Sequence, residues 1–143
     1  MSELLQWRKE RLADAAVLYN NENFAGLVRR VSDRPMNAES SKRLRIWLEQ
    51  IRKAYHYRNV MLLDADGRVR LSLREPEHAF CNEVFARVSE ARQARAPMLL
   101  DFHRAEADGL IRLAVLSPVF DGERFLGVIV LVIDPHAYLY PMI

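Results

Sequence analysis

The sequence has few of the features that mark disulfide-rich, membrane-spanning or nucleic-acid-binding proteins. It contains one cysteine, Cys81, which excludes a disulfide within the chain. The longest uninterrupted apolar run, FLGVIVLVI at 125–133, is too short to span a bilayer and suits a buried strand. The net charge is only +2 and the basic residues are spread along the chain, so we expect no nucleic-acid partner. The N-terminus is charged and shows no signal peptide, which favours a soluble protein or an excised soluble part of a larger one.

Motifs for catalysis and for cofactor binding are absent as well. The sequence has no Ser-His-Asp spacing, no glycine-rich phosphate loop and no paired-carboxylate motif. No two of its four histidines have the close spacing of a zinc-binding helix. We therefore predict a protein that is not an enzyme and that carries no metal and no cofactor.

The chain has the length and composition of one globular domain. Its 143 residues are 50% hydrophobic and 28% charged, which is ordinary for a protein with its own core. We predict a single domain over 1–143, with a helical part at 1–58, a sheet part at 59–134 and a tail at 135–143.

Hydrophobic periodicity gives the order of the elements. It predicts helices over about 5–19, 42–55 and 76–92, and strands over about 60–64, 68–73, 98–104, 110–120 and 124–134. The asparagines at 20, 21 and 23 favour a break or kink after the first helix, which can continue as a second helical piece, FAGLVRRV at 24–31. Ser40 or Ser41 is the expected N-cap of the helix over 42–55, and Pro76 is expected in the first turn of the helix over 76–92. The last strand is apolar on both faces, so we place it in the middle of the sheet.

The stretch DADG at 64–67 has two interpretations, a calcium loop or a hairpin turn. A calcium loop starting at Asp64 would place Arg68 at a ligand position, and Gly67 comes two positions too early. A positive charge cannot replace a ligand oxygen, so the sequence favours a turn between the first two strands.

Two stretches give this chain a resemblance to the extracytoplasmic PAS-like sensor domains called Cache or PDC domains. VMLLDADGRVRLS at 60–72 resembles the first hairpin of that family, and IRLAVLSPVFDGERFLGVIVLVIDP at 111–135 resembles its last two strands. Such domains occur in bacterial histidine kinases, diguanylate cyclases and chemoreceptors. The tail YLYP at 138–141 also resembles segments that continue into a second sensing module.

The resemblance implies an α+β fold with a five-stranded antiparallel sheet. A long N-terminal helix would pack on one face, and a small-molecule pocket would lie on the other face beneath the helix that links strands two and three. The family implies a periplasmic location, a membrane-anchored parent protein and a homodimer formed through the N-terminal helix. Ligand binding would then signal by a change in conformation.

One subfamily binds amino acids through an aspartate five residues after the glycine of GV. Here that glycine is Gly127 and the matching position is Val132, and the Arg-x-Trp signature of the subfamily is absent. Free amino acids are therefore less expected as ligands. Asp134 lies two residues further and shares a strand face with Val132, so it is a candidate substitute.

The remaining ligand candidates lie before the first strand and on the third and fourth strands. Tyr55, Tyr57 and Arg58 precede the first strand, where aromatic and cationic groups frame a ligand mouth in the resembling family, although surface packing explains them equally. The candidates on the strands are Asp101, His103 and Arg112, and Arg112 offers two-pronged binding to a carboxylate.

We predict a sensor of a small molecule, with an organic anion favoured by Arg112, Arg58 and His103. A ligand-free dimerisation module with the same fold is one alternative. A cytoplasmic PAS domain that holds haem or flavin is another alternative. The flavin form is disfavoured because the sequence around Cys81 differs from that of light-sensing PAS domains. We expect Cys81 to be a buried thiol.

Overall fold

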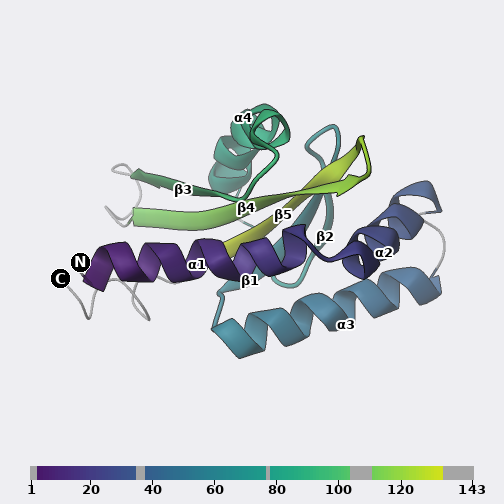
Figure 1. Cartoon of the computed structure of the whole chain (residues 1–143), viewed down its shortest axis with the longest axis horizontal. Coiled ribbons are helices and arrows are strands. Elements are labelled where there is room, and N and C mark those ends of the chain that lie inside the picture. Colours follow the sequence, from purple (N-terminus) through teal and green to yellow (C-terminus); the bar gives the residue numbers. More distant parts are fainter. Residues whose placement is uncertain (1–2, 35–37, 77, 104–110, 134–143) are drawn as a thin grey trace.

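The computed structural model describes residues 3–34, 38–76, 78–103 and 111–133 (Figure 1). The helices are α1 (Glu3–Tyr19), α2 (Glu22–Asp33), α3 (Ala38–Tyr55) and α4 (His78–Ala94). The strands are β1 (Asn59–Asp64), β2 (Val69–Ser72), β3 (Met98–His103), β4 (Ile111–Asp121) and β5 (Arg124–Ile133). The α+β order expected from the sequence is confirmed. None of the helices in these described ranges is long and apolar enough to cross a membrane.

The five strands form one antiparallel sheet in the order β2-β1-β5-β4-β3. The last strand of the sequence, β5, therefore lies in the centre, as its apolar character on both faces predicts. Its side chains alternate between the two faces: Ile129 and Leu131 belong to one buried cluster, and Val128 and Val130 belong to the other.

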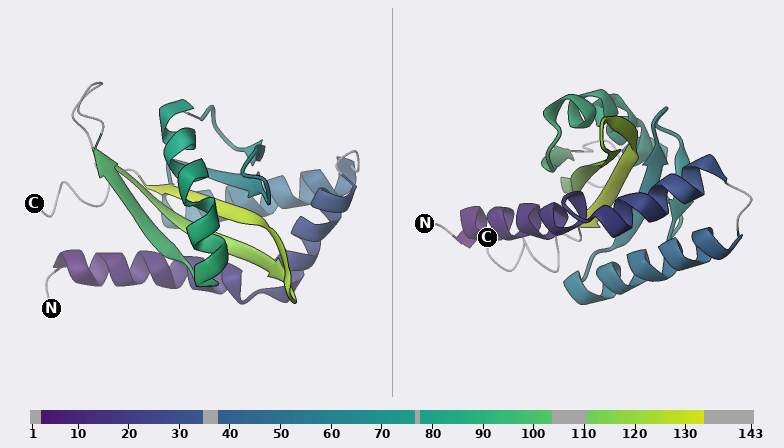
Figure 2. Two further views of the ribbon diagram at one scale, coloured as in Figure 1. Left: turned by 90° about the horizontal axis from the view of Figure 1, so that it is seen from above. Right: turned by 45° about the vertical axis from the view of Figure 1, so that its right-hand side comes forward.

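Three helices cover one face of the sheet and one helix covers the other (Figure 2). The helices α1, α2 and α3 bury their apolar residues against the first face. Val84, Val88 and Ala91 of α4 pack on the second face, at the spacing of a helical stripe. The helix α4, which links β2 and β3, thus lies on the face opposite α1. This confirms the position that the resemblance implies for the linking helix.

The expected long N-terminal helix is divided into α1 and α2. The side chain of Asn21 accepts a hydrogen bond from the Phe24 backbone N–H at 3.0 Å, so Asn21 is the N-cap of α2. The Asn20 amide donates to the Ala16 carbonyl oxygen at 3.0 Å and occupies an acceptor at the end of α1. The asparagines therefore end one helix and begin the next.

Two predicted helix starts are wrong. The helix α3 begins at Ala38, so Ser40 and Ser41 lie inside its first turns, and Ser40 is buried there instead of capping the helix. The helix α4 begins at His78, which leaves Pro76 before the helix instead of in its first turn. Periodicity locates the apolar face of a helix, but the start depends on local hydrogen bonds.

The hairpin prediction for DADG is confirmed. One carboxylate oxygen of Asp64 accepts hydrogen bonds from the backbone N–H groups of Asp66 and Arg68, both at 3.0 Å. The other oxygen forms an ion pair with Arg70 at 3.4 Å. Gly67 has a φ of 87°, which favours glycine. The Asp64 carboxylate therefore closes the β1–β2 turn.

Close packing between two strands explains why the GV motif begins with a glycine. Gly127 pairs with Asp64 of β1 and with Val119 of β4. A Cβ at this position would lie 2.0 Å from the Leu63 carbonyl oxygen, far inside van der Waals contact. Only glycine lets the central strand approach β1 this closely.

Candidate functional site

The strand pairing brings the predicted ligand residues to one end of the sheet. Asn59 at the start of β1 pairs with Val132, and His103 at the end of β3 pairs with Ile111 at the start of β4. Because the strands are antiparallel, β1 and β4 begin at the end of the sheet where β3 and β5 finish. Arg58, His103 and Arg112 therefore share this end, although 54 positions separate the outer two in the sequence.

These residues do not form one compact cluster. The strands β1, β5, β4 and β3 follow one another, so the start of β1 and the end of β3 are three strand spacings apart. At about 4.8 Å per spacing, that distance is about 14 Å. Arg58 and His103 could share a ligand only if the ligand and their two side chains together bridge that distance.

The register also separates the strand candidates between the two faces. Asp101 pairs with Leu113, which belongs to the cluster beneath α1–α3, so the register position of Asp101 is on that face. His103 lies two positions further along the strand and has the same face. Arg112 pairs with Phe102 and lies two positions before Ala114, which belongs to the cluster beneath α4. The register position of Arg112 is thus on the α4 face. For Asp101, His103 and Arg112 the structure describes the backbone alone, and Asp134 lies outside the described residues.

Tyr57 is a core residue beneath the helices. Its side chain is 1% exposed, and its hydroxyl donates to the Asp14 carboxylate at 3.1 Å. The same carboxylate oxygen accepts from Arg11 at 3.0 Å. These bonds fasten α1 to the segment that leads into β1, so Tyr57 is committed to an internal network.

Tyr55 and Arg58 remain at the surface on either side of Tyr57. Tyr55 is 38% exposed at the end of α3, and its ring lies 6.2 Å from the ring of Tyr57. The backbone N–H of Arg58 donates to the Val132 carbonyl oxygen at 2.9 Å, which fixes Arg58 beside the end of β5.

Val132, which the resemblance matches to the amino-acid anchor position, lies on the α4 face. Its side chain is partly buried and packs against the cluster beneath α4. An aliphatic group there cannot pair with an ammonium group. The buried residues beneath α4 include Met61, Leu63 and Val130, which form an apolar cluster with the helix.

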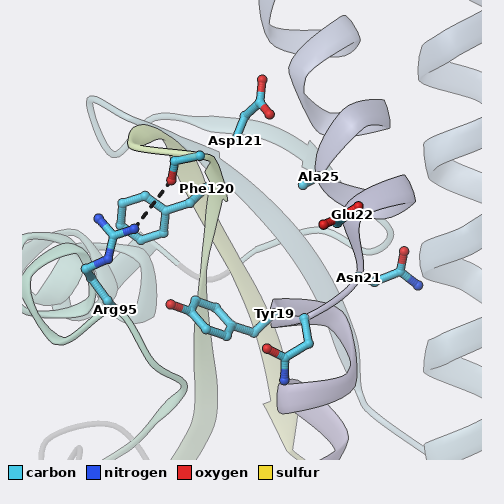
Figure 3. Close-up of a pocket in the computed structure, with 9 residues that line it drawn as sticks. Tyr19, Asn21, Glu22, Ala25, Arg95, Phe120 and Asp121 are labelled. Carbon is cyan, nitrogen blue, oxygen red and sulfur yellow. Dashed lines mark hydrogen bonds between the residues drawn. The ribbon is translucent and has the colours of Figure 1, made fainter.

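The described residues also line a cavity of about 400 Å³ at the opposite end of the sheet, and this cavity is open to solvent. It lies between the break that separates α1 from α2, the β4–β5 turn and the residue after α4 (Figure 3). Its lining residues are Tyr19, Asn20, Asn21, Glu22, Ala25, Arg95, Phe120, Asp121 and Gly122. None of the ligand residues predicted from the sequence lines this cavity, although the polar run YNNEN at 19–23 marks the helix break beside it.

Arg95 forms one wall of this cavity. It has a φ of 49°, and its backbone N–H closes α4 through a bond to Ala91. Its guanidinium lies 4.1 Å from the centre of the Phe120 ring and donates to the Gly122 carbonyl oxygen at 3.4 Å. These contacts hold the end of α4 against the β4–β5 turn.

Two ion pairs join α2 to the same turn. Arg29 contacts Asp121 at 3.0 Å, and Arg124 contacts Asp33 at 2.7 Å. The hydrogen bond from Arg124 holds the pKa of Asp33 below its usual range, partly opposed by desolvation. In the part of the chain that the structure describes, no group of three His, Cys, Asp or Glu side chains is arranged to hold a metal ion.

No protein-family model matches the sequence, and no curated protein matches it. Solved structures do match. The sensory domain of the Campylobacter jejuni chemoreceptor Tlp3 with isoleucine bound has a TM-score of 0.71 and 13% identity, over 96% of this chain and 56% of that one. The sensor domain of the V. cholerae histidine kinase DctB has a TM-score of 0.64 and 16% identity, over 94% and 51%. The ligand-binding domain of the Pseudomonas aeruginosa amino acid chemoreceptor PctC in complex with GABA has a TM-score of 0.59 and 20% identity, over 96% and 61%.

The chain therefore shares the fold of bacterial sensory and ligand-binding domains, which confirms the PAS-like fold class expected from the sequence. It spans between 51% and 61% of the length of these three structures.

Proposed function

We propose that this chain is an extracytoplasmic ligand-sensing domain of a membrane-bound bacterial signalling protein, such as a histidine kinase, a diguanylate cyclase or a chemoreceptor. The observation that supports the proposal is the fold. Almost the whole of this chain superposes on the sensor domains of a histidine kinase and of a chemoreceptor. In this proposal residues 1–143 form a single sensor domain in the periplasm, and the domain binds its ligand without a catalytic step.

The proposed ligand site lies at the end of the sheet where β1 and β4 begin, on the α4 face. Arg112 is the preferred ligand contact because its register position is on this face. Arg58 precedes β1 at the same end, where its backbone N–H bonds to Val132 of β5, and a guanidinium at this place favours a carboxylate. Asp134 stays a candidate from the sequence alone. Val132 at the anchor position disfavours free amino acids, so the preferred ligand is a small organic anion.

The strand β4 offers a physical route for the signal. Leu116 faces the α4 side, and its neighbour Ser117 faces α1, where its hydroxyl donates to the Ala15 carbonyl oxygen at 3.4 Å. A ligand that moves β4 relative to α4 therefore also moves it relative to α1, because both contacts belong to one rigid strand.

A thermal-shift and calorimetry screen against dicarboxylates, amino acids and amines tests the proposal. Dicarboxylates are expected to raise the melting temperature, and Arg112→Ala is expected to weaken their binding by about tenfold or more. Arg45→Ala, which removes an exposed arginine of α3, is the matched control. Failure of every dicarboxylate to bind, or equal binding by Arg112→Ala, would contradict the proposed anion site.

Homodimer formation through α1 is a second proposal with its own support. Leu5 is 56% exposed and Val17 is 62% exposed, so both leave apolar surface of α1 uncovered. Exposed apolar side chains gain free energy when a second helix covers them.

A further inference from the structure

The cavity at the junction of α1, α2 and the β4–β5 turn is lined by charged side chains, and their pairing indicates which charge a ligand would carry. Three of its lining residues are charged: Glu22, Arg95 and Asp121. Asp121 is paired with Arg29 at 3.0 Å. Arg95 is held by Phe120, by the Gly122 carbonyl oxygen and by Glu123 at 3.5 Å. Glu22 is solvent-exposed in the first turn of α2 and makes no ion pair or hydrogen bond with any residue that the structure describes, so the lining carries one negative charge that no described side chain balances.

The hydrogen-bonding groups of the cavity are arranged between two walls. Glu22 lies on the helix side, and Phe120 and Arg95 lie on the side of the turn and of α4 (Figure 3). Tyr19 extends from the end of α1 toward Arg95. The Tyr19 hydroxyl makes no hydrogen bond within the described part of the chain, and the amide of Asn20 is bonded only through its nitrogen. One wall therefore accepts a cation, and the other offers N–H and O–H donors to an oxygen.

We propose that this cavity binds a small organic cation that carries an ammonium group and hydroxyl oxygens, such as an amino sugar. The ammonium group pairs with Glu22 and with the free oxygen of the Asn20 amide. The hydroxyl oxygens accept hydrogen bonds from Arg95 and Tyr19, and the Tyr19 ring packs against the carbon skeleton. A volume of about 400 Å³ is in the range of small-molecule sites and accommodates one hexose-sized ligand.

This site is separate from the anion site proposed above and selects the opposite charge. It lies at the other end of the sheet, where β4 turns into β5. An occupant would contact the end of α1, the start of α2 and the turn together. It would therefore stabilise one angle between α1 and α2, at the break where Asn20 closes α1 and Asn21 caps α2.

Three probes of similar size test the charge and hydroxyl requirements, with binding measured by calorimetry and located by backbone amide chemical shifts. Glucosamine carries both groups, glucose lacks the ammonium group, and cyclohexylamine lacks the hydroxyl groups. Glucosamine is expected to bind at least about tenfold more tightly than either of the others, because each lost charge-assisted or paired hydrogen bond costs about that factor. The shifts are expected at residues 19–25, 95 and 120–122.

Two variants with matched controls separate the site from general stability. Glu22→Gln removes the charge and is expected to weaken glucosamine binding at least about tenfold. Glu39→Gln is its control, because it removes a carboxylate from the first turn of another helix, α3, away from the cavity. Ala25→Leu fills the cavity and is expected to abolish binding, whereas Ala54→Leu places the same side chain on the exposed end of α3.

Any one of the following results overturns the assignment. One is that none of the probes binds the wild-type protein at millimolar concentration. Another is that glucose binds as tightly as glucosamine, or that Glu22→Gln binds as tightly as wild type. The third is that the shifts appear at the start of β1 and β4, which would place the ligand at the proposed anion site instead.

Discussion

Phe85 of α4 lies directly over Gly67 in the turn between β1 and β2. A Cβ at Gly67 would be 2.6 Å from Cδ2 of the Phe85 ring, although Phe85 is 58% exposed to solvent. The DADG turn thus provides the surface on which this part of α4 rests, and a side chain at position 67 would displace the ring.

Gly67→Ala is expected to destabilise the protein by about 1–2 kcal/mol, because alanine is disfavoured at a φ of 87°. The cost is expected to fall in a Phe85→Ala background, where the ring no longer has to move. Gly26→Ala is the control, since a Cβ there meets nothing within 4 Å, and it is expected to stabilise α2 by about 0.5–1 kcal/mol. Chemical denaturation measures wild type and these four variants, with the double substitution included, and an equal cost of Gly67→Ala in the wild-type and Phe85→Ala backgrounds would contradict the close contact.

Gly127→Ala is expected to cost about 3 kcal/mol or more, because the new Cβ would meet the backbone of β1, which cannot move without breaking the sheet. Gly122→Ala provides the comparison. Gly122 also has a positive φ, of 60°, but a Cβ there has open space, so only the conformational cost of about 1 kcal/mol is expected. Equal free energies of unfolding for the two variants would show that the approach of β5 to β1 is looser than described.

The Asp33–Arg124 pair is expected to make stability depend on pH at the acid end. The pKa of Asp33 is lowered in the folded protein by its hydrogen bond with Arg124. The stabilisation is therefore present above the usual aspartate pKa of about 3.9, and it is lost as the pH falls through the lower folded value. The melting-temperature difference between wild type and Asp33→Asn is expected to shrink as the pH falls from about 5 to 2. Glu83→Gln, at an exposed position of α4, is expected to show no such change; a constant difference for Asp33→Asn would contradict the role of the pair.

Dimerisation through α1 predicts that charges at Leu5 and Val17 give a monomer in analytical ultracentrifugation. Leu5→Glu with Val17→Glu is preferable to deletion of the helix, because Trp7, Ala15 and Leu18 of α1 are part of the core and their loss would unfold the domain. Ile46→Glu on the exposed face of α3 is the control. A dimer that survives the double substitution would exclude α1 as the interface.

Much of the fold follows from local pattern. The elements, the β1–β2 hairpin and the central place of β5 were all predictable, because the period of apolar residues and the turn chemistry of Asp64 and Gly67 are properties of short stretches. The starts of α3 and α4 were not, because Ser40 and Pro76 carry N-terminal signals that the surrounding helix geometry overrides.

The arrangement of the predicted ligand residues depended more on tertiary structure than the fold did. The residue types were visible in the sequence, and so was the alternation of faces along each strand. Only the strand order showed that Arg58, His103 and Arg112 share one end of the sheet, with about 14 Å between the outer two. Tyr57 illustrates the limit: its position before β1 suggests a ligand mouth, but contact with Asp14 of α1 makes it part of the core.

The sequence by itself thus determined which segments are helix and strand, that β5 is buried on both sides, and that DADG is a turn and not a calcium loop. The tertiary structure alone decided that Phe85 covers Gly67, that Gly127 touches the backbone of β1, and that Tyr19, Glu22 and Arg95 line one cavity. The physical reason is that periodicity and turn chemistry act over a few residues, whereas these contacts join residues 18 to 76 positions apart and form only when the sheet and its covering helices are assembled.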